Sequence, residues 1–80
     1  MPDKDGNTEL HYAAASGNIV LVKAIATAEI VNEQNAKGET PVLLAFRNNH
    51  LEAGLELINC GANAKISDHS GKCARDYMPD

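Results

Sequence analysis

The sequence repeats itself at an interval of about 33 residues, and this periodicity limits the possible folds more than any other feature. Gly6 and Thr8 recur 32 positions later as Gly38 and Thr40, and Gly38 recurs 33 positions later as Gly71. The apolar residues that follow recur in the same register, so that Leu10, Ala13, Ala14 and Ile19 fall on Val42, Ala45, Phe46 and Leu51. Units with such spacing stack against one another along the chain.

Each unit begins with signals for a short helix. The glycine of the tip suits a turn with a positive φ angle, and the threonine two residues later can cap the helix that follows. In the first unit Leu10, Ala13 and Ala14 then lie on one helical face, where small side chains let a neighbouring helix approach closely. Gly17, or Asn49 in the second unit, tolerates the left-handed conformation that ends such a helix.

A second helix follows in each unit. In the second unit we expect this helix to end at Gly61. Its buried stripe is expected to consist of Leu51, Leu55 and Ile58, and its exposed side carries Glu52 and Glu56. In the first unit we expect it over Ile19 to Ala28, which is apolar on nearly every side except at Lys23. That helix either packs between neighbours, with Val20 and Leu21 toward a preceding repeat, or offers an apolar patch to a partner.

The composition supports an all-α fold. One domain is expected over residues 1–80, with one repeat at about 3–34, a second at about 35–67 and a partial or capping repeat at about 68–80. The chain has one Phe, two Tyr and no Trp, and its apolar content is mainly Ala, Leu, Ile and Val, which favours closely packed helices over a sheet. A domain of this size buries only about 60% of its unfolded surface, so its margin of stability is thin.

The net charge of −4 argues against nucleic-acid and anionic-membrane partners, because both require a concentrated basic surface. No run of 18 or more apolar residues occurs, and the start of the chain lacks the basic and apolar segments of a signal peptide. Cys60 and Cys73 stand alone, without the further pair that a disulfide framework or a zinc site needs. These features predict a reduced, intracellular and cytoplasmic setting, with no metal and no cofactor.

Two short motifs suggest loops that bind ions or phosphate. Acidic residues before Gly6 suggest a calcium loop, but aligning Gly6 with the obligatory glycine puts Met1 at the first ligand position and Tyr12 at the bidentate one. The Gly-Lys pair at 71–72 suggests a phosphate loop, but Cys73 follows where Ser or Thr is required. Neither loop can be built from these residues.

Histidine and cysteine side chains are the remaining candidates for chemistry. His11 could act as a general base, but the spacing offers no nucleophile or carboxylate partner, and His50 and His69 are isolated. Cys60 at a helix end and Cys73 at a capping position have no adjacent cation or motif that would activate a thiol. We therefore expect structural roles for these side chains and no catalytic residue.

The motifs resemble those of ankyrin repeat proteins, whose period is near 33 residues and whose signature is Thr-Pro-Leu-His-x-Ala. Residues 8–14 read Thr-Glu-Leu-His-Tyr-Ala-Ala, and residues 40–46 read Thr-Pro-Val-Leu-Leu-Ala-Phe. The segments 17–32 and 49–65 resemble the second helix of that family and the loop after it. The resemblance implies a stacked solenoid in which His11 bonds Thr8 and the loop backbone and so ties repeats together.

The sequence departs from the family pattern at several positions. Glu9 replaces the usual proline in the first unit, and Leu43 stands at the histidine position of the second. The first unit is one residue short around residues 24–28. The third unit has Cys-Ala in place of Thr-Pro, places Arg75 at an apolar position and reaches Pro79 before any second helix. We therefore expect two repeats and a partial or capping third.

The resemblance also implies a function, the binding of a protein partner through the tips and the concave surface of the inner helices, by a monomer or part of a longer array. A non-catalytic segment of a larger enzyme or effector protein, or a structural spacer, is the alternative. In this sequence the contact positions would be Lys4, Asp5, Asn7, Ala15, Ser16, Ala36, Lys37, Glu39, Arg47, Asn48, His69, Ser70 and Lys72.

Overall fold

Two pairs of short helices and one further helical turn are the helical elements of residues 4–78, the part of the chain that the structure describes. The computed structural model describes residues 4–78, and its elements in chain order are α1 (Glu9–Ser16), α2 (Ile19–Ile25), α3 (Pro41–Arg47), α4 (Leu51–Asn59) and the 3-10 helix η1 (Ala74–Asp76). No strand occurs within these described residues. The predicted all-α fold of helix, turn, helix and tip is confirmed.

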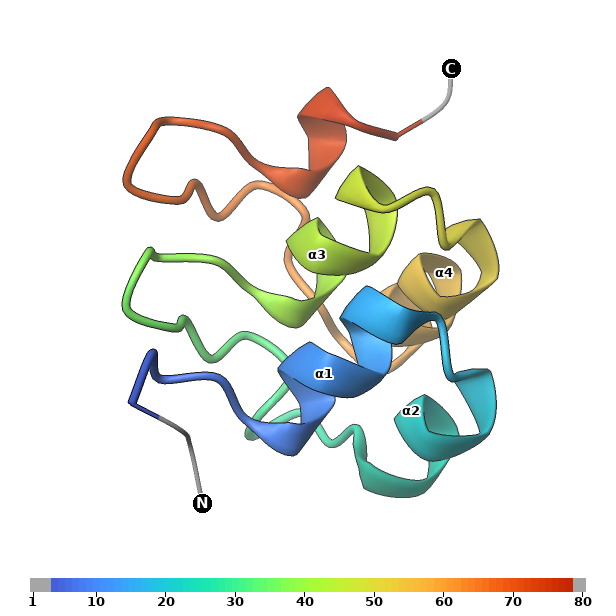
Figure 1. Ribbon diagram of the computed structural model, residues 1–80. Coiled ribbons are helices and arrows are strands. Elements are labelled where there is room, and N and C mark those ends of the chain that lie inside the picture. Colours follow the sequence, from blue (N-terminus) through green and yellow to red (C-terminus); the bar gives the residue numbers. More distant parts are fainter. Residues whose placement is uncertain (1–3, 79–80) are drawn as a thin grey trace.

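The helices form two rows along the stack (Figure 1). The inner row holds α1, α3 and η1, next to the extended tips, and the outer row holds α2 and α4 on the side away from the tips. In the inner row α1 packs against α3, and α3 packs against η1, while α1 and α3 also pack against α2 and α4 of their own repeats. The tips therefore come to lie one above another along one edge of the molecule.

The predicted helix boundaries rest on local chemistry that the structure confirms. The side-chain oxygens of Thr8 and Thr40 accept backbone N–H groups three residues later and cap α1 and α3. Gly17 follows α1 with a φ angle of 74°, and Asn49 follows α3 with a φ angle of 64°. These left-handed residues turn the chain so that each outer helix runs back beside its inner helix.

The core lies between the two rows and is filled differently in the two repeats. Ala14 of α1 and Val22 of α2 are fully buried in the first repeat. Offset by 32 residues, the second repeat has Phe46 and Gly54 at the same places. A Cβ atom on Gly54 would lie 2.6 Å from the ring of Phe46, so the aromatic ring occupies the volume that a side chain would otherwise fill.

The predicted buried stripe of α4 is wrong. The buried residues of this helix are Ala53, Gly54 and Leu57, whereas Leu51 is 41% exposed and Leu55 is 53% exposed. Of the predicted stripe only Ile58 packs partly against the core. The helix turns Gly54 toward the Phe46 ring, because any side chain at that position would overlap the ring. The larger leucines consequently face outward.

The helix α2 is shorter than predicted and more exposed. It ends at Ile25 rather than at Ala28, because the carbonyl oxygen of Thr27 accepts the N–H groups of Ile30 and Val31 and begins a separate turn. Within α2 only Val22 is fully buried, and Val20 is 80% exposed. Its packing is therefore confined to one side.

The third unit contributes a single helical turn to the described part of the chain. Cys73 caps η1 as predicted, and its backbone N–H donates to the carboxylate of Asp76 at 2.8 Å. Hydrogen bonds from the backbone and the side chain of Cys73 lower the pKa of Asp76. Ala74 is the buried residue of this turn, while Arg75 is exposed. Pro79, which the third unit was expected to reach before any second helix, lies outside the described residues.

Candidate protein-binding surface

The tip of the second repeat is shaped by one asparagine side chain. The Oδ1 atom of Asn35 accepts the backbone N–H groups of Lys37 at 3.0 Å and Glu39 at 2.9 Å. The Asn35 backbone N–H donates to the Glu39 carbonyl, and the Gly38 N–H donates to the Asn35 carbonyl. Gly38 completes this tight turn with a φ angle of 79°. Asn35 therefore fixes the direction in which Lys37 leaves the tip.

Asp68 performs the same task in the tip of the third unit. Its Oδ1 atom accepts the backbone N–H groups of Ser70 and Lys72, each at 2.9 Å, and the Ser70 hydroxyl at 2.7 Å. The Ser70 hydroxyl and the Lys72 amide hold the pKa of Asp68 below its ordinary value. Neither Asn35 nor Asp68 was predicted from the sequence to have this role. The signal that identifies them is an Asn or Asp three residues before the tip glycine.

Backbone hydrogen bonds join neighbouring tips. The N–H of Ala36 donates to the carbonyl of Asp5 at 2.8 Å, and the N–H of His69 donates to the carbonyl of Lys37 at 2.9 Å. The same bond thus recurs at both junctions and keeps the tips in one row. Side chains at the tips are presented at regular intervals along the edge of the stack.

His11 ties the first repeat to the second, as the family resemblance implies. The ring is 1% exposed, and its Nδ1 atom accepts the backbone N–H of Thr8 at 3.0 Å. Because Nδ1 accepts, the neutral ring carries its proton on Nε2, which donates to the Glu39 carbonyl oxygen at 2.8 Å. Both ring nitrogens are occupied by these structural bonds, so neither is open to a substrate.

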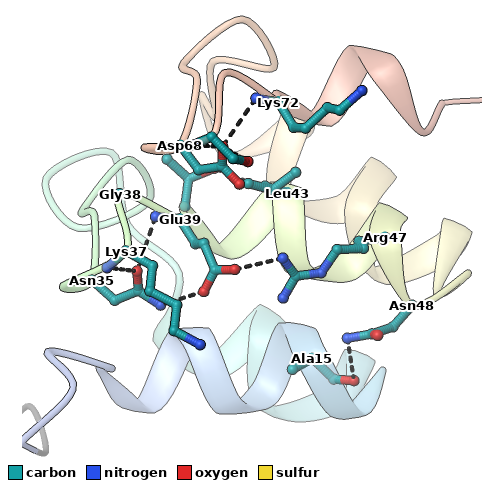
Figure 2. A network of polar contacts seen from close by, with 12 residues as sticks. Ala15, Asn35, Lys37, Gly38, Glu39, Leu43, Arg47, Asn48, Asp68 and Lys72 are labelled. Atoms are coloured by element: carbon teal, nitrogen blue, oxygen red, sulfur yellow. Dashed lines mark hydrogen bonds and ion pairs between the residues drawn. The ribbon is translucent and has the colours of Figure 1, made fainter.

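Glu39 is a buried anion held by two donors (Figure 2). Asn35 Nδ2 donates to Oε1 at 2.8 Å, and Arg47 forms an ion pair with Oε2. Burial raises the pKa of Glu39, but the hydrogen bonds from Asn35 and Arg47, together with the charges of Arg47 and Lys37, lower it by more. The net pKa lies below the ordinary value, and Glu39 stays charged at neutral pH.

Glu39, which the family resemblance put among the contact positions, is largely enclosed by the protein. The residue is only 8% exposed, and both carboxylate oxygens are engaged inside the protein. Sequence alone could not show this, because Glu39 lies in the tip and Arg47 ends the inner helix eight residues later. The pairing instead fixes the side chain of Arg47, which remains 37% exposed.

Three hollows open on the side of the tips and inner helices. The largest has a volume of about 470 Å³ and is lined by Ala36, Lys37, Glu39, Arg47, Asp68, His69 and Ser70. The second, of about 210 Å³, is lined by Asn7, His11, Tyr12, Ala15, Glu39, Leu44, Arg47 and Asn48. The third, of about 160 Å³, is lined by Asp5, Asn7, Asn35, Ala36, Lys37 and Glu39.

Ten of the thirteen predicted contact residues line these hollows, and Lys4, Ser16 and Lys72 lie outside them. Tyr12 was missed, although it is 55% exposed and lies three residues before Ala15 on the same face of α1. The three-residue spacing from Ala15, a predicted contact residue, was the signal in the sequence that could have identified Tyr12. We use the name binding face for the thirteen predicted residues together with Tyr12 and Asp68.

Metal sites and membrane-spanning helices have no counterpart in the part of the chain that the structure describes. No group of three His, Cys, Asp or Glu side chains in residues 4–78 is placed to hold a metal ion. Within the same range no helix has the length and apolar character needed to cross a bilayer. Cys60 and Cys73 are free and partly buried.

Comparisons with known proteins identify the family. Residues 1–68 match the family described as ankyrin repeats (3 copies). Human transient receptor potential cation channel subfamily A member 1 is 37% identical over 60 residues, which cover 71% of this chain and 5% of that protein. Palmitoyltransferase ZDHHC17 of Rattus norvegicus is 36% identical over 73 residues, covering 89% of this chain and 12% of that protein. The chain thus spans a small part of these relatives, and it belongs to the ankyrin repeat family.

Proposed function

We propose that the chain is a protein-interaction module that holds its partner against the binding face. Ankyrin repeats are modules of this kind, and the finer assignment to this face rests on one observation. Glu39 borders all three hollows, so the hollows adjoin and form one surface across the tips and the inner helices. A stack whose units contact mainly their neighbours leaves such a surface open for a partner.

The side chains of the binding face suit protein recognition. Tyr12 and Arg47 belong to the residue types that contribute most binding energy at protein interfaces. Arg47 is held in place by Glu39, so less side-chain entropy is lost when a partner binds. Ala15 and Ala36 leave space between these larger groups. The face therefore combines fixed anchors with room for a partner's side chains.

Site-specific crosslinking tests this proposal. A photoreactive amino acid at Ala36, which borders the largest hollow, is expected to capture a partner in extracts of the native cell. The matched control carries the same group at Ala28, which is exposed in the turn after α2. Mass spectrometry should identify proteins captured at Ala36 and absent at Ala28. Capture at Ala28 alone would place the partner on another surface.

We further propose that the module is non-catalytic, acts as a monomer or within a longer array, and works in the cytoplasm. Support comes from His11, whose two ring nitrogens are both engaged, and from two free thiols that suit a reducing compartment. Cell fractionation with an antibody against the chain, followed by light scattering of the purified protein, tests location and mass. Recovery in an exported fraction, or a defined dimer, would contradict these statements.

A second candidate is favoured by the comparisons. The relatives carry the matching region as 5% or 12% of a longer protein, and one of them is named as a palmitoyltransferase. The chain would then be the non-catalytic ankyrin segment of a larger enzyme or effector. Mass spectrometry of the native protein decides this, because a mass well above 8.5 kDa supports the larger protein. A structural spacer, in contrast, would show no saturable partner.

A further inference from the structure

The charges of this acidic protein are unevenly distributed. Four of its seven Lys and Arg residues lie on the binding face, namely Lys4, Lys37, Arg47 and Lys72. Of the nine Asp and Glu residues within the described range 4–78, three lie there, namely Asp5, Glu39 and Asp68. The rest of the chain therefore carries the net negative charge. The binding face, with four cations and three anions, therefore repels an anionic group less than the acidic remainder of the chain does.

Two acidic groups of the binding face are already engaged within the protein. Glu39 accepts from Asn35 and Arg47 with its two oxygens, and the Oδ1 atom of Asp68 accepts three donors. Glu39 is consequently a poor acceptor for a further ligand, and one of the two carboxylate oxygens of Asp68 is occupied in the same way.

The basic groups of the binding face retain donors. Arg47 donates to Glu39 through Nη1, and its other guanidinium nitrogens form no protein hydrogen bond within residues 4–78. In the same described range, the ammonium groups of Lys37 and Lys72 form no hydrogen bond or ion pair. Lys37 and Arg47 lie on opposite sides of Glu39 and both border the largest hollow (Figure 2). The hollow therefore presents cationic donors from two directions.

We propose that the binding face recognises an acidic protein segment, with closely spaced Asp or Glu side chains that accept from Lys37 and Arg47 across the largest hollow. This inference rests on the proposed function and names the chemistry of the partner. The ion pair with Glu39 fixes Arg47 before binding, while Lys37 is directed by the Asn35 turn. Carboxylates, which carry one negative charge each, fit this arrangement. The face has few cations, and the buried charge of Glu39 lies between Lys37 and Arg47.

A nucleic acid fits the same face less well. Its phosphate backbone is held by proteins that place many cations along one groove and release counterions. This face has four cations among three anions, on a chain of net charge −4. A phosphate strand that extends beyond the hollow would meet the acidic remainder of the molecule. The protein segment is therefore the occupant that the charges favour.

Amide chemical-shift mapping tests the inference on the intact chain. The probe is a peptide of alternating Glu and Ala, with the same peptide carrying Gln for Glu as the neutral control and an oligothymidine as the phosphate control. The Glu peptide is expected to shift the amides of Lys37, Arg47 and His69 and to bind more weakly as salt is raised. Equal binding of the Gln peptide, or equal or tighter binding of oligothymidine, would overturn the proposal.

Charge reversal provides the second arm. The double variant Lys37→Glu with Lys72→Glu is expected to weaken binding of the Glu peptide at least about tenfold. Its matched control, Lys23→Glu with Lys65→Glu, changes net charge equally at exposed sites off the binding face and is expected to change binding less than about twofold. Arg47 is left unchanged, because its removal would leave Glu39 buried without its ion pair. Equal losses in both variants would show that only net charge matters.

The outcomes separate this inference from the proposed function. If a partner crosslinks at Ala36 while the Glu peptide and the Gln peptide bind equally, the interaction surface stands and the acidic specificity is wrong. If nothing crosslinks at Ala36 and no peptide shifts the amides of the binding face, both are wrong. Circular dichroism of the reversed variants confirms folding, so that a lost contact is not confused with lost structure.

Discussion

The stack has two junctions: the first joins the two full repeats, and the second joins the second repeat to the third unit. The two junctions share one hydrogen bond at the tips and differ in their side-chain and helix contacts. Both have the tip hydrogen bond, from Ala36 to Asp5 and from His69 to Lys37. Only the first adds a buried side chain, because His11 crosses to the Glu39 carbonyl. At the second, Leu43 occupies the histidine position, and an apolar side chain cannot form that bond.

Further side-chain bonds and helix packing also differ between the two junctions. The first also has the side-chain bond from Asn35 to Asn7 at 2.8 Å and two helices packing against two helices. The second has an exposed bond from Gln34 to the Ser67 carbonyl at 3.3 Å and one helical turn packed on α3. Equal tip geometry therefore does not give equal stability, because the burial behind the tips supplies most of the free energy.

The largest expected effect comes from breaking the first junction. His11→Leu places at this junction the residue type found at the second, and it leaves the Thr8 N–H and a lone pair of the Glu39 carbonyl without their partner. The free energy of unfolding should fall by about 3 kcal/mol, measured by urea denaturation. Glu9→Leu, an exposed change on the same helix, should cost less than about 1 kcal/mol. Equal losses would show that the His11 bonds do not hold the junction.

Hydrogen exchange compares the two junctions without substitution. The amides of Asp76 and Leu44 are both hydrogen bonded to backbone carbonyls, in η1 and α3 respectively. The Asp76 amide should exchange at least about a hundredfold faster relative to its intrinsic rate, a difference of about 2.7 kcal/mol, because the third unit opens first. Protection in the third unit equal to that of α3 would contradict the weakness of the second junction.

A packing variant compares the cores of the two repeats. Gly54→Val should cost about 2 kcal/mol, because the new side chain overlaps the Phe46 ring. Adding Phe46→Ala recreates the pair that Ala14 and Val22 form in the first repeat. The double variant should therefore lose at least about 1 kcal/mol less than the sum of the two single variants, as measured by a double-mutant cycle. Strict additivity would mean that the two pairs are not equivalent.

The tip glycines give a smaller contrast. Gly38 and Gly71 have φ angles of 79° and 88°, so alanine is strained at either position. A Cβ at Gly38 would also lie 2.7 Å from the ring of His69 and 3.0 Å from its backbone nitrogen, whereas a Cβ at Gly71 meets nothing within 4 Å. In thermal unfolding Gly38→Ala should cost about 1 kcal/mol more than Gly71→Ala. A reversed order would show that the second tip contact is loose.

The smallest expected effect concerns pH at the first junction. The pKa of Glu39 is lower in the folded protein than its ordinary value of 4.5, so folding is favoured by the charged form. This contribution is present in full above the ordinary pKa and is lost as pH falls through the folded pKa. Glu39→Gln should therefore lose less stability on acidification, by under about 1 kcal/mol because Arg47 is partly exposed. If the free energy of unfolding of Glu39→Gln depended on pH as it does in the unaltered protein, Glu39 would not contribute to the loss of stability in acid.

The sequence by itself determined the parts of this protein that depend on neighbouring residues. Thr8 and Thr40 cap helices, and Gly17 and Asn49 end them, because each acts on backbone within a few residues. The recurring spacing then predicted the stacked all-α fold, and the family resemblance implied the contact positions, ten of which line the three hollows. The role of His11 followed from the family resemblance, since no local rule reveals that its second bond reaches Glu39.

The tertiary structure decided the features that depend on volume and on distant partners. The apolar periodicity placed Leu51 and Leu55 on the buried side of α4. In the structure both are exposed, and the Phe46 ring leaves no room for a side chain at Gly54 on the buried side. Likewise, the burial of Glu39 follows from Asn35 and Arg47 converging on it from the tip and the inner helix. Neither fact is visible in a pattern of residue types, because packing density and charge pairing are set by where separate helices meet.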